Sequence, residues 1–220
     1  MAFRLFRFRP AVPRRGVRLH VGAGRERLEG WVNLDIQRLP GVDVVTDVTQ
    51  GLDFEDAEAI YAEHFLEHLR IDAAVDFLAE CHRVLAPGAW LRLSTPNLEW
   101  VLVTHYHPWL SPQEKASEAI VLNRAFHGWR HRFLWNRHLL DRTLTACGFA
   151  PVVWCRWGES EQPLFTGIER HQKLIESDVH PHVLIAEARK PAGAAGGGGS
   201  EALAELRAEI ARDFLSHLDD

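Results

Sequence analysis

The sequence predicts an α/β protein in which helices cover both faces of a mostly parallel sheet. Short apolar runs alternate with amphipathic stretches along residues 17–96, which is the order expected of βα units. The first apolar run ends in Gly22-Ala-Gly24 and the second ends in Asp35, a pattern typical of the ligand-binding edge of such a sheet. Two late apolar runs, separated by a polar loop, suit an antiparallel edge of the same sheet.

The expected strands follow the apolar runs in order. They cover residues 17–21, 31–34, 42–46, 57–62, 89–94, 151–157 and 182–188. A helix is expected at residues 71–85, ended by a turn at Pro87-Gly88, because apolar side chains recur on one face: Ala74, Leu78, Cys81 and Leu85. A second helix, with Leu140 and Leu144 on its apolar face, should begin after the cap residue Asn136 and run to about Cys147, where Gly148 stops it.

Residues 97–135 fit neither the strand pattern nor the helix pattern. They are rich in aromatic residues and histidines, among them Trp100, His105, Trp109, His127, Trp129, His131 and Trp135. Such an insertion would either cover the ligand edge of the sheet or form a small apolar core of its own. The sequence leaves both alternatives open.

The two ends differ in composition from the middle. Residues 1–16 form a basic arm, expected to be solvated or paired at a sheet edge, with a clamp for an anionic substrate or membrane surface as the alternative. Residues 191–200 have the composition of a flexible linker. Residues 201–220 predict an amphipathic helix, whose apolar stripe is Leu203, Leu206, Ile210, Phe214 and Leu218. We expect this helix to dock on its own domain or to form a homodimer.

Composition narrows the class of protein. A chain of 220 residues is long enough for one domain with a substantial core. The net charge of −5 gives no reason to expect nucleic acid as a partner. The three cysteines show no CxxC spacing, so a disulfide framework is not expected and a reduced, cytoplasmic setting fits best. No apolar run approaches the roughly 20 residues of a transmembrane helix.

The glycine turn and Asp35 indicate a site for a nucleoside cofactor, since glycines admit a ligand close to the backbone and a carboxylate binds ribose hydroxyls. A dinucleotide is disfavoured. The third glycine of that motif is missing, and Asp35 follows Gly24 by only 11 residues instead of about 20. The spacing suits a cofactor that has a ribose and no phosphate, such as S-adenosylmethionine.

The chain resembles the class I S-adenosylmethionine-dependent methyltransferases, in the small bacterial branch of the methyltransferase type 11 domain. The matching pieces, in order, are RLHVGAG, GWVNLDI, VVTDV, AIYAEHFLEHL, CHRVLAPGAWLRLSTPN and LLDRTLTACGF, and the resemblance covers roughly residues 17–190. The resemblance implies a Rossmann-like, seven-stranded sheet with an antiparallel last strand. It also implies the cofactor-binding residues Val21, Gly22, Ala23, Gly24, Asn33, Leu34, Asp35, Ile36, Asp47, Val48, Glu63 and His64.

The stretch that follows the fourth expected strand places three polar residues together. If it opens a helix, then His64, Glu67 and His68 lie on one face. Three interpretations stay open: a structural helix end, a catalytic base at His64 or His68, and a divalent metal site at His64, Glu67 and His68. The spacing resembles the Glu-x-x-Glu-His motif of small-RNA and quinone O-methyltransferases, and His127 or His131 would supply a further ligand.

The predicted function is transfer of a methyl group from S-adenosylmethionine to oxygen or nitrogen of a small-molecule or sugar-like acceptor. One rival is a metal-dependent hydrolase that uses His64, Glu67 and His68. The other is a non-catalytic scaffold that binds the cofactor. Most of the loop at residues 158–171 is expected to be solvated, although it lies near the ligand edge.

Overall fold

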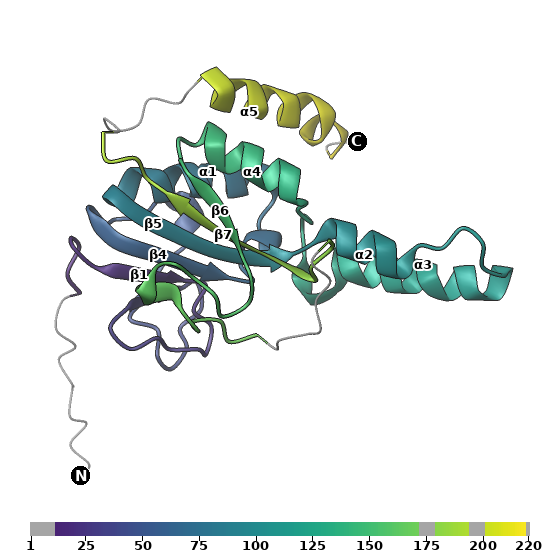
Figure 1. The fold of residues 1–220 in the computed structure, drawn as a ribbon, viewed down its shortest axis with the longest axis horizontal. Coiled ribbons are helices and arrows are strands. Elements are labelled where there is room, and N and C mark those ends of the chain that lie inside the picture. Colours follow the sequence, from purple (N-terminus) through teal and green to yellow (C-terminus); the bar gives the residue numbers. More distant parts are fainter. Residues whose placement is uncertain (1–11, 172–178, 194–200, 219–220) are drawn as a thin grey trace, which may run out of the picture.

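The computed structural model describes residues 12–171, 179–193 and 201–218, and within them it forms a seven-stranded sheet with helices around it (Figure 1). The strand order is β3-β2-β1-β4-β5-β7-β6. The strands are β1 (Arg18–Val21), β2 (Val32–Asp35), β3 (Val44–Val45), β4 (Ala57–Glu63), β5 (Leu85–Pro96), β6 (Val152–Cys155) and β7 (Val183–Arg189).

The first five strands pair in parallel, and β7 lies antiparallel to both β5 and β6. The predicted Rossmann-like sheet with an antiparallel strand near its end is therefore confirmed. The chain runs outward from β1 through β2 to β3 and then returns to β4, on the other side of β1. Ligands of open α/β sheets bind at such a reversal, outside the carboxyl ends of the strands. The reversal therefore points to the ends of β1 and β4.

Two predicted boundaries are corrected. The strand expected at residues 42–46 is reduced to two residues, because the Asp47 side chain accepts a hydrogen bond from Thr49 N and begins the 3-10 helix η1 (Val48–Gln50). Strand β5 begins directly after the first helix and continues past Pro87-Gly88, where Gly88 N donates to Lys190 O. The expected separate turn is thus an irregularity inside the strand, where the pairing with β4 shifts register.

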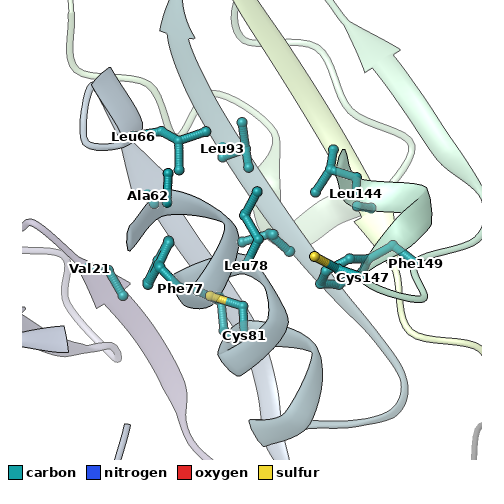
Figure 2. Packing of buried hydrophobic residues seen from close by; sticks show 14 of the residues in the cluster. Val21, Ala62, Leu66, Phe77, Leu78, Cys81, Leu93, Leu144, Cys147 and Phe149 are labelled. Atoms are coloured by element: carbon teal, nitrogen blue, oxygen red, sulfur yellow. The ribbon is translucent and has the colours of Figure 1, made fainter. Parts of the chain in front are cut away.

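The main core lies between the sheet and α1 (Ile71–Val84), which Figure 2 shows from close by. Side chains of α1, including Phe77, Leu78 and Cys81, pack against Val21 and Leu93 of the sheet (Figure 2). The predicted apolar face of this helix is confirmed, since Ala74, Leu78 and Cys81 are fully buried.

Helix α4 (Arg137–Ala146) closes another part of the core and carries the predicted signals at both ends. Asn136 accepts a hydrogen bond from Leu139 N at the first turn. Gly148 follows the helix with φ +98°, a backbone conformation that glycine adopts without strain.

The last helix, α5 (Glu201–Asp213), lies on α1 and α4 (Figure 1). Leu203, Leu206 and Ile210 are buried in the main core, and Arg207 forms an ion pair with Asp76 of α1. The apolar face that a homodimer would use is therefore packed inside the chain. Beyond α5 lies the 3-10 helix η5 (Leu215–His217).

The insertion at residues 97–135 forms two helices, α2 (Leu98–His105) and α3 (Pro112–His127), which project from one end of the sheet (Figure 1). Helix α3 has no buried residue and starts with a capping box at Ser111 and Glu114. The two tryptophans Trp109 and Trp135 do not join in a separate aromatic core of the insertion. Trp109 is 77% exposed, whereas Trp135 is buried in the main core.

The basic arm is described only from residue 12 onward, and residues 1–11 lie outside the described part of the chain. Arg14, Arg15 and Arg18 form ion pairs with nearby acidic side chains of this chain. The predicted linker lies mostly outside the described residues as well, from 194 to 200. Where the structure describes helices, none combines the length and the apolar content that crossing a membrane requires.

Candidate functional site

The glycine turn follows β1, as the sequence predicts. Gly22 and Gly24 have φ angles of +67° and +55°, and Ala23 N donates a hydrogen bond to Leu34 O at 2.9 Å. A Cβ atom on Gly22 would lie 2.6 Å from Cδ2 of Phe65, whereas a Cβ on Gly24 would meet nothing closer than 4.0 Å. Gly22 is therefore required both by its backbone angle and by the Phe65 ring.

Asp35, at the end of β2, holds this turn in place. Its Oδ2 atom accepts a hydrogen bond from Gly24 N at 2.8 Å, and its Oδ1 atom accepts one from Gln37 N at 2.7 Å. A carboxylate offers about four lone-pair positions, so two remain for further donors. The arrangement suits a ligand with two neighbouring hydroxyls.

A cavity of about 500 Å³ opens beside this turn. The predicted residues that line it are Val21, Gly22, Asp35, Ile36, Asp47, Val48, His64 and His68. Its other lining residues are Gln37, Thr46, Thr49, Phe65, Leu69, Trp129, Arg130 and Arg132. The side chain of Ile36 is 64% exposed, which leaves an apolar surface for a flat ring next to Asp35 and Asp47. We refer to this space as the cofactor cavity.

The remaining predicted cofactor residues do not line this cavity. Ala23 and Leu34 are buried in the sheet, and Gly24 reaches the site through its hydrogen bond to Asp35. Asn33 is fully buried, and its amide donates to the carbonyls of Leu28 and Trp31, which folds the segment before β2.

Glu63, the last residue of β4, is hydrogen-bonded to the loop at residues 158–171. Its carboxylate accepts hydrogen bonds from the backbone N–H groups of Arg170 and His171 and from the His171 ring. Burial by itself would raise the pKa of Glu63, but these hydrogen bonds, led by the one from the His171 side chain, lower it to about 2. Glu63 therefore anchors the loop as a permanent carboxylate.

His64 and Glu67 form a pair directly after β4. His64 has φ +46°, a strained angle for a residue with a side chain, and its N–H donates to Ser94 O. His64 Nδ1 lies 2.9 Å from Glu67 Oε1, and Thr95 Oγ1 donates to Glu67 Oε2 at 3.1 Å. Burial opposes the charged imidazole, but the hydrogen bond to Glu67 raises the pKa of His64 overall.

The predicted helix through this stretch is wrong. Residues Leu66–His68 form one 3-10 turn, η2, so His64 and His68 do not share a helical face. Glu67 is fully buried, and its backbone carbonyl accepts hydrogen bonds from Arg132 N and Phe133 N. Glu67 thus connects the end of β4 to the segment after the insertion.

A second cavity, of about 480 Å³, lies on the other side of His64. Half of its lining residues are apolar or aromatic: Pro96, Trp100, Val101, Val121, Ala125, Trp129 and Leu134. Its polar lining residues are His64, Glu67, His68, His105, Arg124, His131 and His182. His64, His68 and Trp129 border both cavities. Residues of the insertion therefore line this cavity. We refer to this second space as the acceptor cavity, after the methyl acceptor that the sequence predicts.

The group of potential metal ligands in the structure differs from the group that the sequence predicts. Ligand atoms of Glu67, His68 and His131 lie within 4.8 Å of one another, and His64 is not in this group. His131 comes from the segment after the 3-10 helix η3 (Gly128–Arg130), in which Trp129 and Arg130 both have positive φ. The exposed His127 is not in the group.

The late loop is more buried than the sequence suggests. Phe165, in the 3-10 helix η4 (Pro163–Phe165), packs with Ile168 under Trp31 and Tyr61. The fully buried Arg92 pairs with Glu169 of this loop and with Glu187 of β7. The expectation of a mostly solvated loop is wrong at these positions, because a buried guanidinium draws the loop onto the sheet.

Several site residues were not predicted. Phe65, Arg132 and Leu134 approach the cavities only through long-range folding, and His182 reaches its place at the start of β7 next to Trp100. For Arg132 and Leu134 the one signal was the density of aromatic residues and histidines in the insertion, and Phe65 and His182 lie outside it.

Comparison with known proteins agrees with this arrangement. A model of the methyltransferase domain family matches residues 22–93, from the glycine turn to β5. The sheet order is that of the Rossmann-like methyltransferase fold, as the sequence predicted. No curated protein matches the chain.

Solved structures of methyltransferases are similar to the chain at low identity. A SAM-dependent methyltransferase from Archaeoglobus fulgidus is 16% identical over 80% of this chain and 86% of its own, with a TM-score of 0.49. The 1,6-didemethyltoxoflavin-N1-methyltransferase of Burkholderia thailandensis is 20% identical over 81% and 72%, with a TM-score of 0.49.

Proposed function

We propose that this protein transfers the methyl group of S-adenosylmethionine to an oxygen or nitrogen of a small acceptor. The observation that carries the proposal is the meeting of two cavities at His64, His68 and Trp129. A methyl donor in one cavity and a nucleophile in the other would face each other at that border. The catalytic domain in this proposal spans residues 17–190, and residues 97–135 form its cap.

The residues present fit the cofactor. Asp35 retains lone pairs for the two ribose hydroxyls, and the exposed side chain of Ile36 offers a face for the adenine between Asp35 and Asp47. The glycine turn leaves room for the methionine part beside Gly22. When bound, the cofactor supplies a sulfonium methyl that is already electrophilic, so the protein needs mainly to align a nucleophile and to exclude water.

His64 is the proposed base for a hydroxyl acceptor. Its Nδ1–H donates to the buried Glu67, which fixes the ring and leaves the lone pair on Nε2 to accept a proton. His68 is the second proposed base for a chain without a bound metal ion, since it borders both cavities as well. An amine that reaches the site unprotonated would not need this step.

The acceptor cavity favours a ligand with an apolar or flat body. Trp100, Trp129 and Leu134 contribute apolar surface, and the rings of His105 and His182 lie beside Trp100. Aromatic rings suit this lining, and aromatic residues also stack on the faces of sugars, so a sugar-like acceptor stays within the proposal.

Methyl transfer is tested by the formation of S-adenosylhomocysteine with a panel of phenolic, amine and sugar acceptors. We expect turnover with at least one apolar or aromatic member of the panel. Replacement of His64 by Ala should then lower kcat for a hydroxyl acceptor by roughly 100-fold with little change in the KM for the cofactor. Tight cofactor binding without turnover on any acceptor would contradict the proposal and favour a scaffold.

A further inference from the structure

The acceptor cavity contains three side chains whose arrangement methyl transfer alone does not explain. Glu67 and His68 come from η2, and His131 comes from the segment after η3. One ligand atom of each residue lies within 4.8 Å of the others, and the two imidazole rings are 5.4 Å apart. Two imidazoles next to a fully buried carboxylate are a common donor set for a metal ion.

The histidine rings are oriented from behind by backbone carbonyls. His131 Nδ1 lies 2.9 Å from Ala125 O, and His68 Nδ1 makes a longer contact of 3.4 Å with Arg130 O. A carbonyl can only accept, so Nδ1 carries the hydrogen in each ring and the lone pair of the neutral imidazole lies on Nε2. Metal-binding histidines are held in this way, with the other ring nitrogen donating to a carbonyl or carboxylate.

The carboxylate of Glu67 is also oriented by hydrogen bonds, one to each of its oxygens. His64 donates to one of its oxygens and Thr95 to the other. About two of its lone-pair positions are left for a cation. The backbone carbonyl of Glu67 accepts hydrogen bonds from Arg132 N at 2.7 Å and Phe133 N at 3.3 Å, so backbone contacts tie the segment that carries His131 to Glu67.

We propose that Glu67, His68 and His131 bind one divalent transition-metal ion of the zinc class at the wall of the acceptor cavity. The nitrogen-rich donor set favours zinc or cobalt over magnesium and calcium, which prefer all-oxygen sites. Three protein ligands leave a coordination position for a hydroxyl of the acceptor. There the ion would lower the pKa of that hydroxyl, a role that rests on the methyltransferase function proposed above.

Metal binding is measured on the full chain after dialysis against EDTA, without cofactor or acceptor. Titration with ZnCl₂ should give one ion per chain, and CoCl₂ should produce visible absorption bands of a bound ion. MgCl₂ should give no binding under the same conditions. Because neither cofactor nor acceptor is present, failure here leaves the methyltransferase proposal untouched, and a loss of cofactor binding would leave this site untouched.

The variants His68→Ala and His131→Ala should each weaken Zn²⁺ binding by more than about 100-fold, the upper range for loss of even a supporting residue. The matched control is His127→Ala, which removes an exposed histidine four positions before His131 and should leave the affinity unchanged. Both tested histidines are half-buried, and melting without metal confirms that each variant folds. The site is overturned if the wild type binds no stoichiometric Zn²⁺, or if both variants bind it as tightly as the wild type.

Discussion

The carboxylate of Asp35 accepts a hydrogen bond from the backbone N–H of Gly24 at 2.8 Å. This contact joins the end of β2 to the turn after β1, and it places an acid beside a backbone that has no side chain to obstruct a ligand. Asp35 thus has two roles, since it fixes the turn and offers its remaining lone pairs to the cavity. Replacing it should therefore affect ligand binding more than the fold.

The two glycines of the turn should differ in how much stability the protein loses when each is replaced by alanine. In Gly22→Ala the new Cβ would clash with the Phe65 ring at 2.6 Å and the φ angle would be strained, so we expect a loss of about 3 kcal/mol in unfolding free energy. Gly24→Ala carries only the backbone strain and should lose about 1 kcal/mol. Urea unfolding measures both. Adding Phe65→Ala should recover part of the loss in Gly22→Ala only, and equal losses in the two single variants would contradict the clash.

Glu63 should make stability depend on pH in the acidic range. Its pKa is about 2 in the folded protein, below the ordinary value of 4.5. Its contribution is therefore fully present above about pH 4.5 and is lost as the pH falls toward 2, and it amounts to about 3 kcal/mol at most.

Urea unfolding of the wild type and Glu63→Gln at pH 6 and pH 3 isolates this carboxylate, since all other groups are shared. The stability difference between the two proteins should shrink at pH 3. A difference that stays constant between the two pH values would show that the hydrogen bonds of Glu63 to Arg170 and His171 do not favour its charged form.

Arg92 should be the most costly arginine to remove. Its replacement by Met would leave Glu169 and Glu187 buried without a counter-charge, and we expect a loss of about 3 to 5 kcal/mol together with release of the late loop. Limited proteolysis within residues 158–171 reports the release. The control is Arg18→Met, which breaks the exposed pair with Glu58 and should cost at most about 1 kcal/mol. Equal effects of the two variants would refute the anchoring role of Arg92.

Docking of α5 is tested by Leu206 inside the helix and Leu218 beyond its C-terminal end. Leu206 is fully buried against α1 and α4, so Leu206→Asp should lower the melting temperature markedly. Leu218 is 51% exposed, and Leu218→Asp should leave the melting temperature nearly unchanged. If Leu206→Asp melts like the wild type, the helix is not held on its own domain in solution.

Local patterns predicted the parts of the fold that local chemistry determines. Asn136 and Gly148 delimit α4 because a cap and a positive φ act within a few residues. The buried face of α1 could be predicted because the apolar residues of this helix recur with a helical period along one side. The helices α2 and α3 could not be predicted from the sequence pattern. Helix α3 buries no residue and therefore has no apolar stripe.

The site was predictable where one strand end supplies the residue, as at Asp35 and Asp47. It was not predictable where the fold joins distant segments. His131 takes the place predicted for His64 in the group with Glu67 and His68, while the His64 ring pairs with Glu67 from outside this group. Phe65 occupies the space above Gly22, so part of the glycine requirement comes from this chain's own packing.

The most direct test of the central claim is calorimetric titration of S-adenosylmethionine into the wild type, Asp35→Ala and the control Asp53→Ala. The Asp53 side chain is 92% exposed, pairs with Arg14 and does not line the cofactor cavity. We expect micromolar binding by the wild type and Asp53→Ala, and a loss of at least about 30-fold in Asp35→Ala, in line with two lost charge-assisted hydrogen bonds. No binding by the wild type at millimolar cofactor, or equal binding by Asp35→Ala, would contradict the account.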